Sequence, residues 1–127
     1  MTCVWDALRS KIRADDLKRI LGVPAPTARQ LVLGLKSKNQ ATLGVKWQGK
    51  ALTRMEMEEN MKWIEAHDVN TIGNGYDCSC SDPYLFLVCH LFNVRIVHQY
   101  LNASITYDPP GPSRYELQFA NNHGHFW

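Results

Sequence analysis

The run Ser81-Asp82-Pro83-Tyr84-Leu85-Phe86-Leu87-Val88-Cys89-His90-Leu91-Phe92 marks the centre of the molecule. Ser81-Asp82-Pro83 is a helix start signal, with a hydroxyl cap and a proline in the first turn. The segment from there to Phe92 is apolar nearly all round, whereas a surface helix carries a single apolar stripe. We therefore expect a central, buried helix over this run.

Three strands are predicted after this helix. Residues 94–100 alternate, so that Val94, Ile96 and His98 share one face of a strand. Asn102 and Ala103 turn the chain into a second strand over 104–107, and a third strand is expected over 115–120. The proline-rich residues 108–112 between the last two strands cannot join a sheet. The second half of the chain thus predicts a helix packed on a small antiparallel sheet.

The first half of the chain reads as helical. Helices are expected over residues 4–12, from Asp15 to a stop at Gly22, and from the cap Thr27 to Lys38. Thr53-Arg54-Met55-Glu56 is a capping box that starts a helix to about His67. A short hairpin is expected over 44–52, and a loop over 70–80. The predicted fold class is α+β, with the helical half packed on the antiparallel sheet.

Length and composition place the chain as one domain over residues 1–127. Basic and acidic residues are mixed, the net charge is +2, and the cationic residues 36–50 fit a solvated face, so a nucleic-acid partner is not expected. No apolar run reaches the length of a membrane span, and the first residues lack the pattern of a signal peptide, so neither is expected. The four cysteines are expected to stay reduced, which favours the cytoplasm. No cofactor is expected.

Cys3 and the terminal Asn121-Asn122-His123-Gly124-His125-Phe126-Trp127 suggest thiol-nucleophile chemistry. A cysteine at the start of a helix lies where the helix N-terminus favours the thiolate. A histidine from the far end of the domain can accept the thiol proton, provided that the fold brings the two groups together. The sequence therefore predicts Cys3 opposite a histidine delivered by the last strand.

Several motifs resemble those of the ovarian-tumour (OTU) cysteine proteases. Residues 3–8, a cysteine followed by an aromatic residue and then Ala-Leu, are similar to the nucleophile segment of that family. Residues 82–92 look like its buried helix after a Gly-rich loop, and residues 94–97 and 105–107 look like its next strands. His125-Phe126 matches its histidine-aromatic signature. The small viral members are most similar in size, and the papain-like leader proteases of viruses are the nearest alternative.

The resemblance implies an OTU/papain-like fold with Cys3 as nucleophile and His125 as general base and then acid. It also implies ubiquitin, a ubiquitin-like modifier or a viral polyprotein as the substrate, and the host cytoplasm as the location. This chain departs from the family at two positions. Met1-Thr2 stand where an Asp-Gly pair usually precedes the cysteine, and Trp127 stands where an acidic or amide residue often orients the histidine.

Other residues around these two are candidates for supporting roles. His123 is an alternative base, because residues two apart in an extended segment point to the same side. Asn121 or Asn122 could orient the histidine in place of the missing third residue. The substrate cleft is expected to be lined by the following residues: Trp5, Gly75, Tyr76, Asp77, Gly124 and Trp127.

Two alternatives stay open. Cys78, Cys80, His123 and His125 are the ligand types of a closed tetrahedral zinc site, although the spacing within each pair is tighter than in zinc fingers. The chain could instead be a catalytically inactive OTU-like module that binds another protein, which the two departures from the family pattern would favour.

Overall fold

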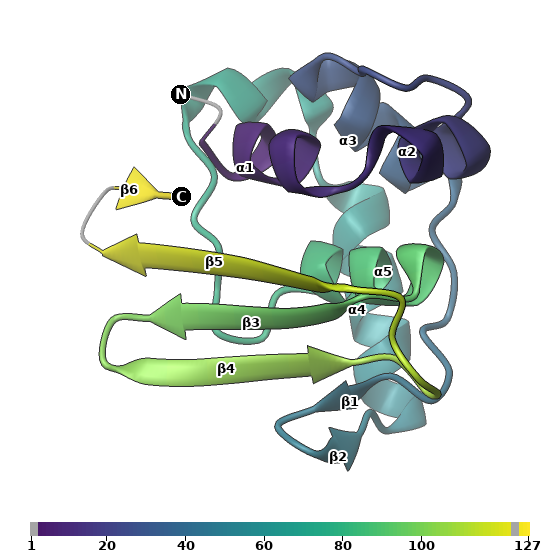
Figure 1. Cartoon of the computed structure of the whole chain (residues 1–127), viewed down its shortest axis with the longest axis vertical. Helices are drawn as coiled ribbons and strands as arrows, with labels where there is room; N and C mark the ends of the chain where they lie inside the picture. Colours follow the sequence, from purple (N-terminus) through teal and green to yellow (C-terminus); the bar gives the residue numbers. More distant parts are fainter. Residues whose placement is uncertain (1–2, 123–124) are drawn as a thin grey trace.

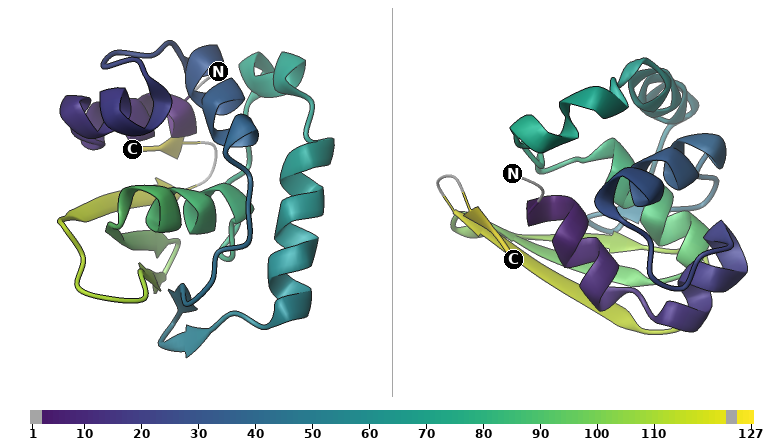
Figure 2. Two further views of the ribbon diagram at one scale, coloured as in Figure 1. Left: turned by 90° about the vertical axis from the view of Figure 1, so that its right-hand side faces the viewer. Right: turned by 90° about the horizontal axis from the view of Figure 1, so that it is seen from above.

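Helix α5 (Pro83–Phe92) occupies the centre of the computed structural model, which describes residues 3–122 and 125–127. The helix lies between the sheet on one side and α4 (Arg54–Ala66) on the other (Figures 1 and 2). Most of its side chains are buried: Tyr84, Leu85, Phe86, Leu87, Val88, Cys89 and Phe92. The prediction of a central, buried helix is confirmed.

The remaining helices cover the top of the sheet in Figure 1 and the side of α5. They are α1 (Cys3–Lys11), α2 (Ala14–Leu21), α3 (Ala28–Ser37) and the 3-10 helix η1 (Val69–Asn74). The capping box expected before α4 is present, because the Thr53 hydroxyl accepts from the Glu56 N–H at 3.1 Å and the Glu56 carboxylate accepts from the Thr53 N–H at 2.9 Å. Only η1 was not predicted, since its residues read as a loop. None of the helices in the described residues combines the length and apolar character needed to cross a bilayer.

The six-stranded sheet has the strand order β2-β1-β4-β3-β5-β6. Its strands are β1 (Lys46–Trp47), β2 (Lys50–Ala51), β3 (Arg95–Tyr100), β4 (Ala103–Asp108), β5 (Glu116–Asn122) and β6 (His125–Phe126). The pairs are antiparallel except β3 and β5, which run parallel with His98 opposite Phe119. The sheet is therefore mixed, and the prediction of an antiparallel sheet is wrong for the β3–β5 pair.

The parallel pair follows from the path of the proline-rich connection. β4 ends beside the start of β3, where Ile96 lies opposite Tyr107. The connection stays at that end of the sheet, because the Arg114 N–H donates to the Asn93 carbonyl at 2.8 Å and the Arg95 N–H donates to the Tyr115 carbonyl at 3.1 Å. β5 consequently starts next to the start of β3 and runs in the same direction.

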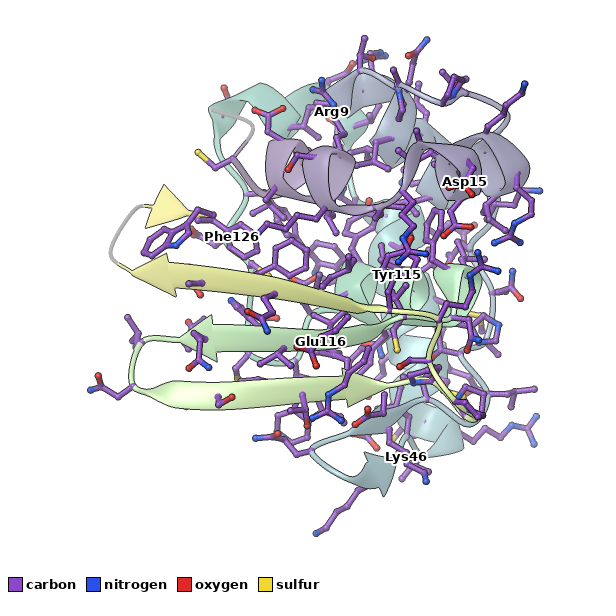
Figure 3. All side chains as sticks on the ribbon, in the orientation of Figure 1. Arg9, Asp15, Lys46, Tyr115, Glu116 and Phe126 are labelled. Atoms are coloured by element: carbon purple, nitrogen blue, oxygen red, sulfur yellow. The ribbon has the colours of Figure 1, made fainter. Side chains whose placement is uncertain are left out.

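The outer edge of β5 faces α1 in Figure 1, and β6 pairs only with the end of β5. The Lys11 ammonium at the end of α1 donates to the Gln118 carbonyl on this edge. The same ammonium lies 4.7 Å from the centre of the Phe119 ring. On the next helix, Asp16 is buried and accepts from the Tyr115 hydroxyl at 2.6 Å, and Figure 3 shows Tyr115 between α2 and the start of β5. These contacts fix α1 and α2 to the sheet.

Asp82 caps the central helix, where the sequence pattern had indicated the Ser81 hydroxyl. Its Oδ1 accepts from the backbone N–H groups of Tyr84 at 3.0 Å and Leu85 at 3.4 Å. A carboxylate satisfies the free N–H groups of a first helical turn and interacts favourably with the helix dipole, which explains its use here in place of a hydroxyl.

The second carboxylate oxygen of Asp82 holds the loop that precedes the helix. It accepts from the Tyr76 hydroxyl at 2.7 Å and from the Ser79 N–H at 3.2 Å. The Asp82 N–H donates to the Tyr107 hydroxyl of β4 at 3.0 Å. Burial raises the pKa of Asp82, and the hydrogen bonds that it accepts oppose that shift. The side chain thus joins the loop to α5, and its N–H joins α5 to the sheet.

We predict that Asp82→Ala lowers the free energy of unfolding by about 3 kcal/mol or more, because it removes a helix cap and leaves the hydroxyl of the half-buried Tyr76 without its acceptor. Urea denaturation followed by circular dichroism measures the loss. The control is Asp77→Ala, an exposed carboxylate on the same loop. Equal effects of the two substitutions would contradict the role given to Asp82.

Candidate functional site

The first turn of α1 and strand β6 lie at the same end of the molecule (Figures 1 and 2). Cys3 is the first residue of α1 and is half-buried against the core. β6 pairs with the end of β5, where Asn122 lies opposite His125 and Asn121 opposite Phe126. α1 packs against β6. Folding therefore brings together the two segments in which the nucleophile and the base are expected.

β6 is held by backbone bonds that continue past its last residue. The Trp127 N–H donates to the Ala120 carbonyl at 2.8 Å, and the Ala120 N–H donates to the Trp127 carbonyl at 2.8 Å. Phe126 is buried, and Figure 3 shows it beside the end of β5. The backbone position of His125 is thus defined by the strand on which it lies. His123 and Gly124 lie outside the described residues, as do the side chains of Asn122 and His125.

The residues expected to line a substrate cleft fall into two groups. Gly75 and Asp77 are exposed on the loop after η1, and Trp127 is 49% exposed beside β6. Tyr76 is half-buried, with its hydroxyl on Asp82. Trp5 is 0% exposed, so its indole cannot line a cleft and the prediction for this residue is wrong. The apolar face of α1 carries Trp5 into the core, although it follows Cys3 by only two positions.

The Trp5 ring lies in an aromatic cluster between α1, α4 and α5. The members of this cluster are Trp5, Trp63, His67, Tyr76 and Tyr84. Trp5 and Tyr76 have ring centres 4.8 Å apart, so the cluster also holds the loop after η1 against α1. Trp63 stacks on His67, with ring centres 5.2 Å apart, and remains partly exposed.

His98 is a polar side chain that the sequence analysis left with no functional role. It lies on the inward face of β3, as the alternation of residues 94–99 predicts, and is 0% exposed. Its Nε2 lies 2.5 Å from Oδ1 of Asn121. The side-chain oxygen of Asn121 is therefore hydrogen-bonded to His98. The sequence analysis had suggested Asn121 as an orienting group for the catalytic histidine. The signal that points to His98 is a histidine at a position that otherwise takes aliphatic residues.

The zinc hypothesis is tested only in part, because the side chains of His123 and His125, two of its four ligands, lie outside the described residues. Cys78 is buried and Cys80 is exposed, so the two thiols of Cys78-Ser79-Cys80 lie in different environments. Burial raises the pKa of Cys78, with the neighbouring Asp82 adding to the shift, and this favours the protonated thiol over a metal-binding thiolate. Within residues 3–122 and 125–127, no three described His, Cys, Asp or Glu side chains gather as a metal-binding group.

No family model, curated protein or solved structure matches the chain significantly. The resemblance to OTU proteases therefore rests on the short sequence motifs alone.

The cluster histidine makes stability depend on pH. Burial lowers the pKa of His67, and the nearby Lys36 cation lowers it further, while Asp68 opposes both. Since the unfolded chain then binds a proton that the native state does not, the free energy of unfolding contributed by His67 falls as the pH drops below about 6.5. We predict a shallower loss of stability in His67→Gln than in the wild type, from urea denaturation at pH 7.5 and pH 5. Parallel curves for the two proteins would contradict this prediction.

Proposed function

We propose that the protein is a cysteine peptidase of the OTU type, with Cys3 as nucleophile and His125 as general base. The observation that carries this proposal is the packing of α1 against β6. Cys3 is the first residue of α1, and His125 is the first residue of β6. A cysteine at a helix N-terminus lies where the helix dipole stabilises negative charge. These are the two requirements for an activated thiol: a field that favours the thiolate and a base within the same site.

The proposed reaction is acyl transfer from an amide to water. His125 takes the proton of Cys3, and the Cys3 sulfur attacks the carbonyl carbon of a peptide or isopeptide bond. As the tetrahedral intermediate collapses, the C–N bond breaks and His125 gives its proton to the leaving amine. Water then attacks the thioester with His125 as base, which releases the carboxylic acid and restores the thiol. A cysteine–histidine dyad suffices because cysteine needs less activation than serine.

The proposed substrate is ubiquitin, a ubiquitin-like modifier or a polyprotein with a similar cleavage sequence, and the proposed location is the cytoplasm, of the host if the protein is viral. The exposed loop residues Gly75 and Asp77 and the exposed Trp127 support a binding surface beside Cys3. They lie on segments next to the first turn of α1, and their exposure leaves them accessible to solvent.

A ubiquitin probe with a C-terminal alkyne tests the proposal, because it forms a covalent bond only with an activated thiol. We expect the wild type to gain the mass of one ubiquitin and Cys3→Ala to gain none. His125→Ala is expected to react about 100-fold or more slowly, since it lacks the base. Intact-protein mass spectrometry measures the adduct.

Cys80→Ala is the matched control, because Cys80 is an exposed thiol on the loop before α5 and should play no part. Its labelling is expected to equal that of the wild type. A folded wild-type protein that forms no adduct with ubiquitin probes or with ubiquitin-like probes would instead indicate the inactive interaction module.

A further inference from the structure

His98 occupies a buried position that an aliphatic residue could fill without the cost of desolvating polar ring nitrogens. Ile96 on the inward face of β3 and Val94 just before the strand are both fully buried. Because an amide oxygen only accepts hydrogen bonds, the 2.5 Å contact with Asn121 Oδ1 places the proton of the neutral ring on Nε2. The other ring nitrogen, Nδ1, is buried and has no partner among the described residues. A buried acceptor without a partner is unfavourable, so the histidine is expected to contribute something other than packing.

The His98 imidazole contacts both strands that end the chain. Its Nε2–H donates to Asn121 on β5, and its ring centre lies 5.5 Å from that of Phe126 on β6. Phe126 also packs on Phe119, with ring centres 5.3 Å apart. One side chain of β3 thereby joins the inward faces of β5 and β6, through a residue that is next to His125 in sequence.

Strand β6 is short, and apart from the Ala120–Trp127 backbone bonds and its packing against α1 it is held through its inward face. It pairs with β5 through only the last residues of that strand, and it forms the edge of the sheet. His125 lies opposite Asn122 and adjoins Phe126, so a shift of Phe126 or of the end of β5 moves the backbone of His125. Misplacement of a catalytic group by about 1 Å is enough to reduce a rate severely.

We propose that His98 is a positioning residue, which acts through Asn121 and Phe126 to hold His125 against Cys3. This inference rests on the proposed function, because it names the residue that sets the geometry of that same dyad. His98 does not touch the substrate. Its hydrogen bond to Asn121 fixes the end of β5 with which β6 pairs.

Thiol alkylation tests the inference without any substrate. Iodoacetamide reacts with the thiolate, so at about pH 6.5 a Cys3 that is paired with His125 should react faster than the exposed Cys80 of the same molecule. Peptide mass spectrometry gives both rates from one sample. In His98→Leu, which keeps the packing volume but removes the donor, we expect the Cys3 rate to fall about tenfold or more, towards that of Cys80.

Asn121→Leu removes the acceptor of the same hydrogen bond at a residue that is only half-buried, and it is expected to give the same fall in the Cys3 rate. It serves as the test variant if His98→Leu does not fold. His98→Gln, which can still present a nitrogen donor, is expected to retain most of the wild-type rate. Ile96→Val is the control, because it weakens the same face of β3 away from Asn121 and Phe126 and should leave the Cys3 rate unchanged. A merely structural role for His98 would lower stability in all of these variants without this pattern of rates.

The outcomes separate the inference from the proposed function. If wild-type Cys3 reacts faster than Cys80 but His98→Leu and Asn121→Leu keep that rate, the positioning role is overturned and the peptidase proposal stands. If wild-type Cys3 reacts no faster than Cys80, the dyad itself is overturned, and the positioning role with it. Hydrogen exchange of the Trp127 amide, which closes β6 on Ala120, reports in parallel whether His98→Leu loosens the strand.

Discussion

The buried carboxylate of Asp82 is the interaction on which the arrangement of the molecule depends. One oxygen caps α5, the other holds Tyr76 and Ser79, and the backbone N–H reaches Tyr107 on β4. Because Tyr76 packs on Trp5, the same chain of contacts continues to α1. Asp82 thus connects the central helix, the sheet and the helix that carries Cys3, at the cost of burying an acidic group that only hydrogen bonds compensate.

Local signals were sufficient to predict most of the elements. The capping box at Thr53, the all-round apolar run of α5 and the alternation along β3 each reflect contacts within one element. The parallel pairing of β5 with β3 could not be predicted in this way, because it depends on where the connection after β4 is anchored, through Arg114 on Asn93. The hydrogen bonds that anchor a connection join residues far apart in sequence, and no periodicity records them.

The segments that supply Cys3 and His125 were predictable from the sequence, whereas the contacts of the residues around them were not. The N-terminal position of Cys3 on a helix and the delivery of His125 by a late strand follow from local patterns. The burial of Trp5 and the engagement of Asn121 by His98 do not, since each depends on which face of an element meets a neighbour. Strand β6, which carries Phe126, was not predicted either, because the third strand was expected to end at residue 120.

The contact between Lys11 and the Gln118 carbonyl has a consequence for how the protein behaves in concentrated solution. Most of the outer edge of β5 has no strand beside it, and such an edge can pair with a strand of another molecule. An ammonium group over that edge occupies a carbonyl and brings a charge that an incoming strand would have to desolvate. Through Lys11, helix α1 therefore also disfavours pairing of this edge with a strand of another molecule, and with it aggregation.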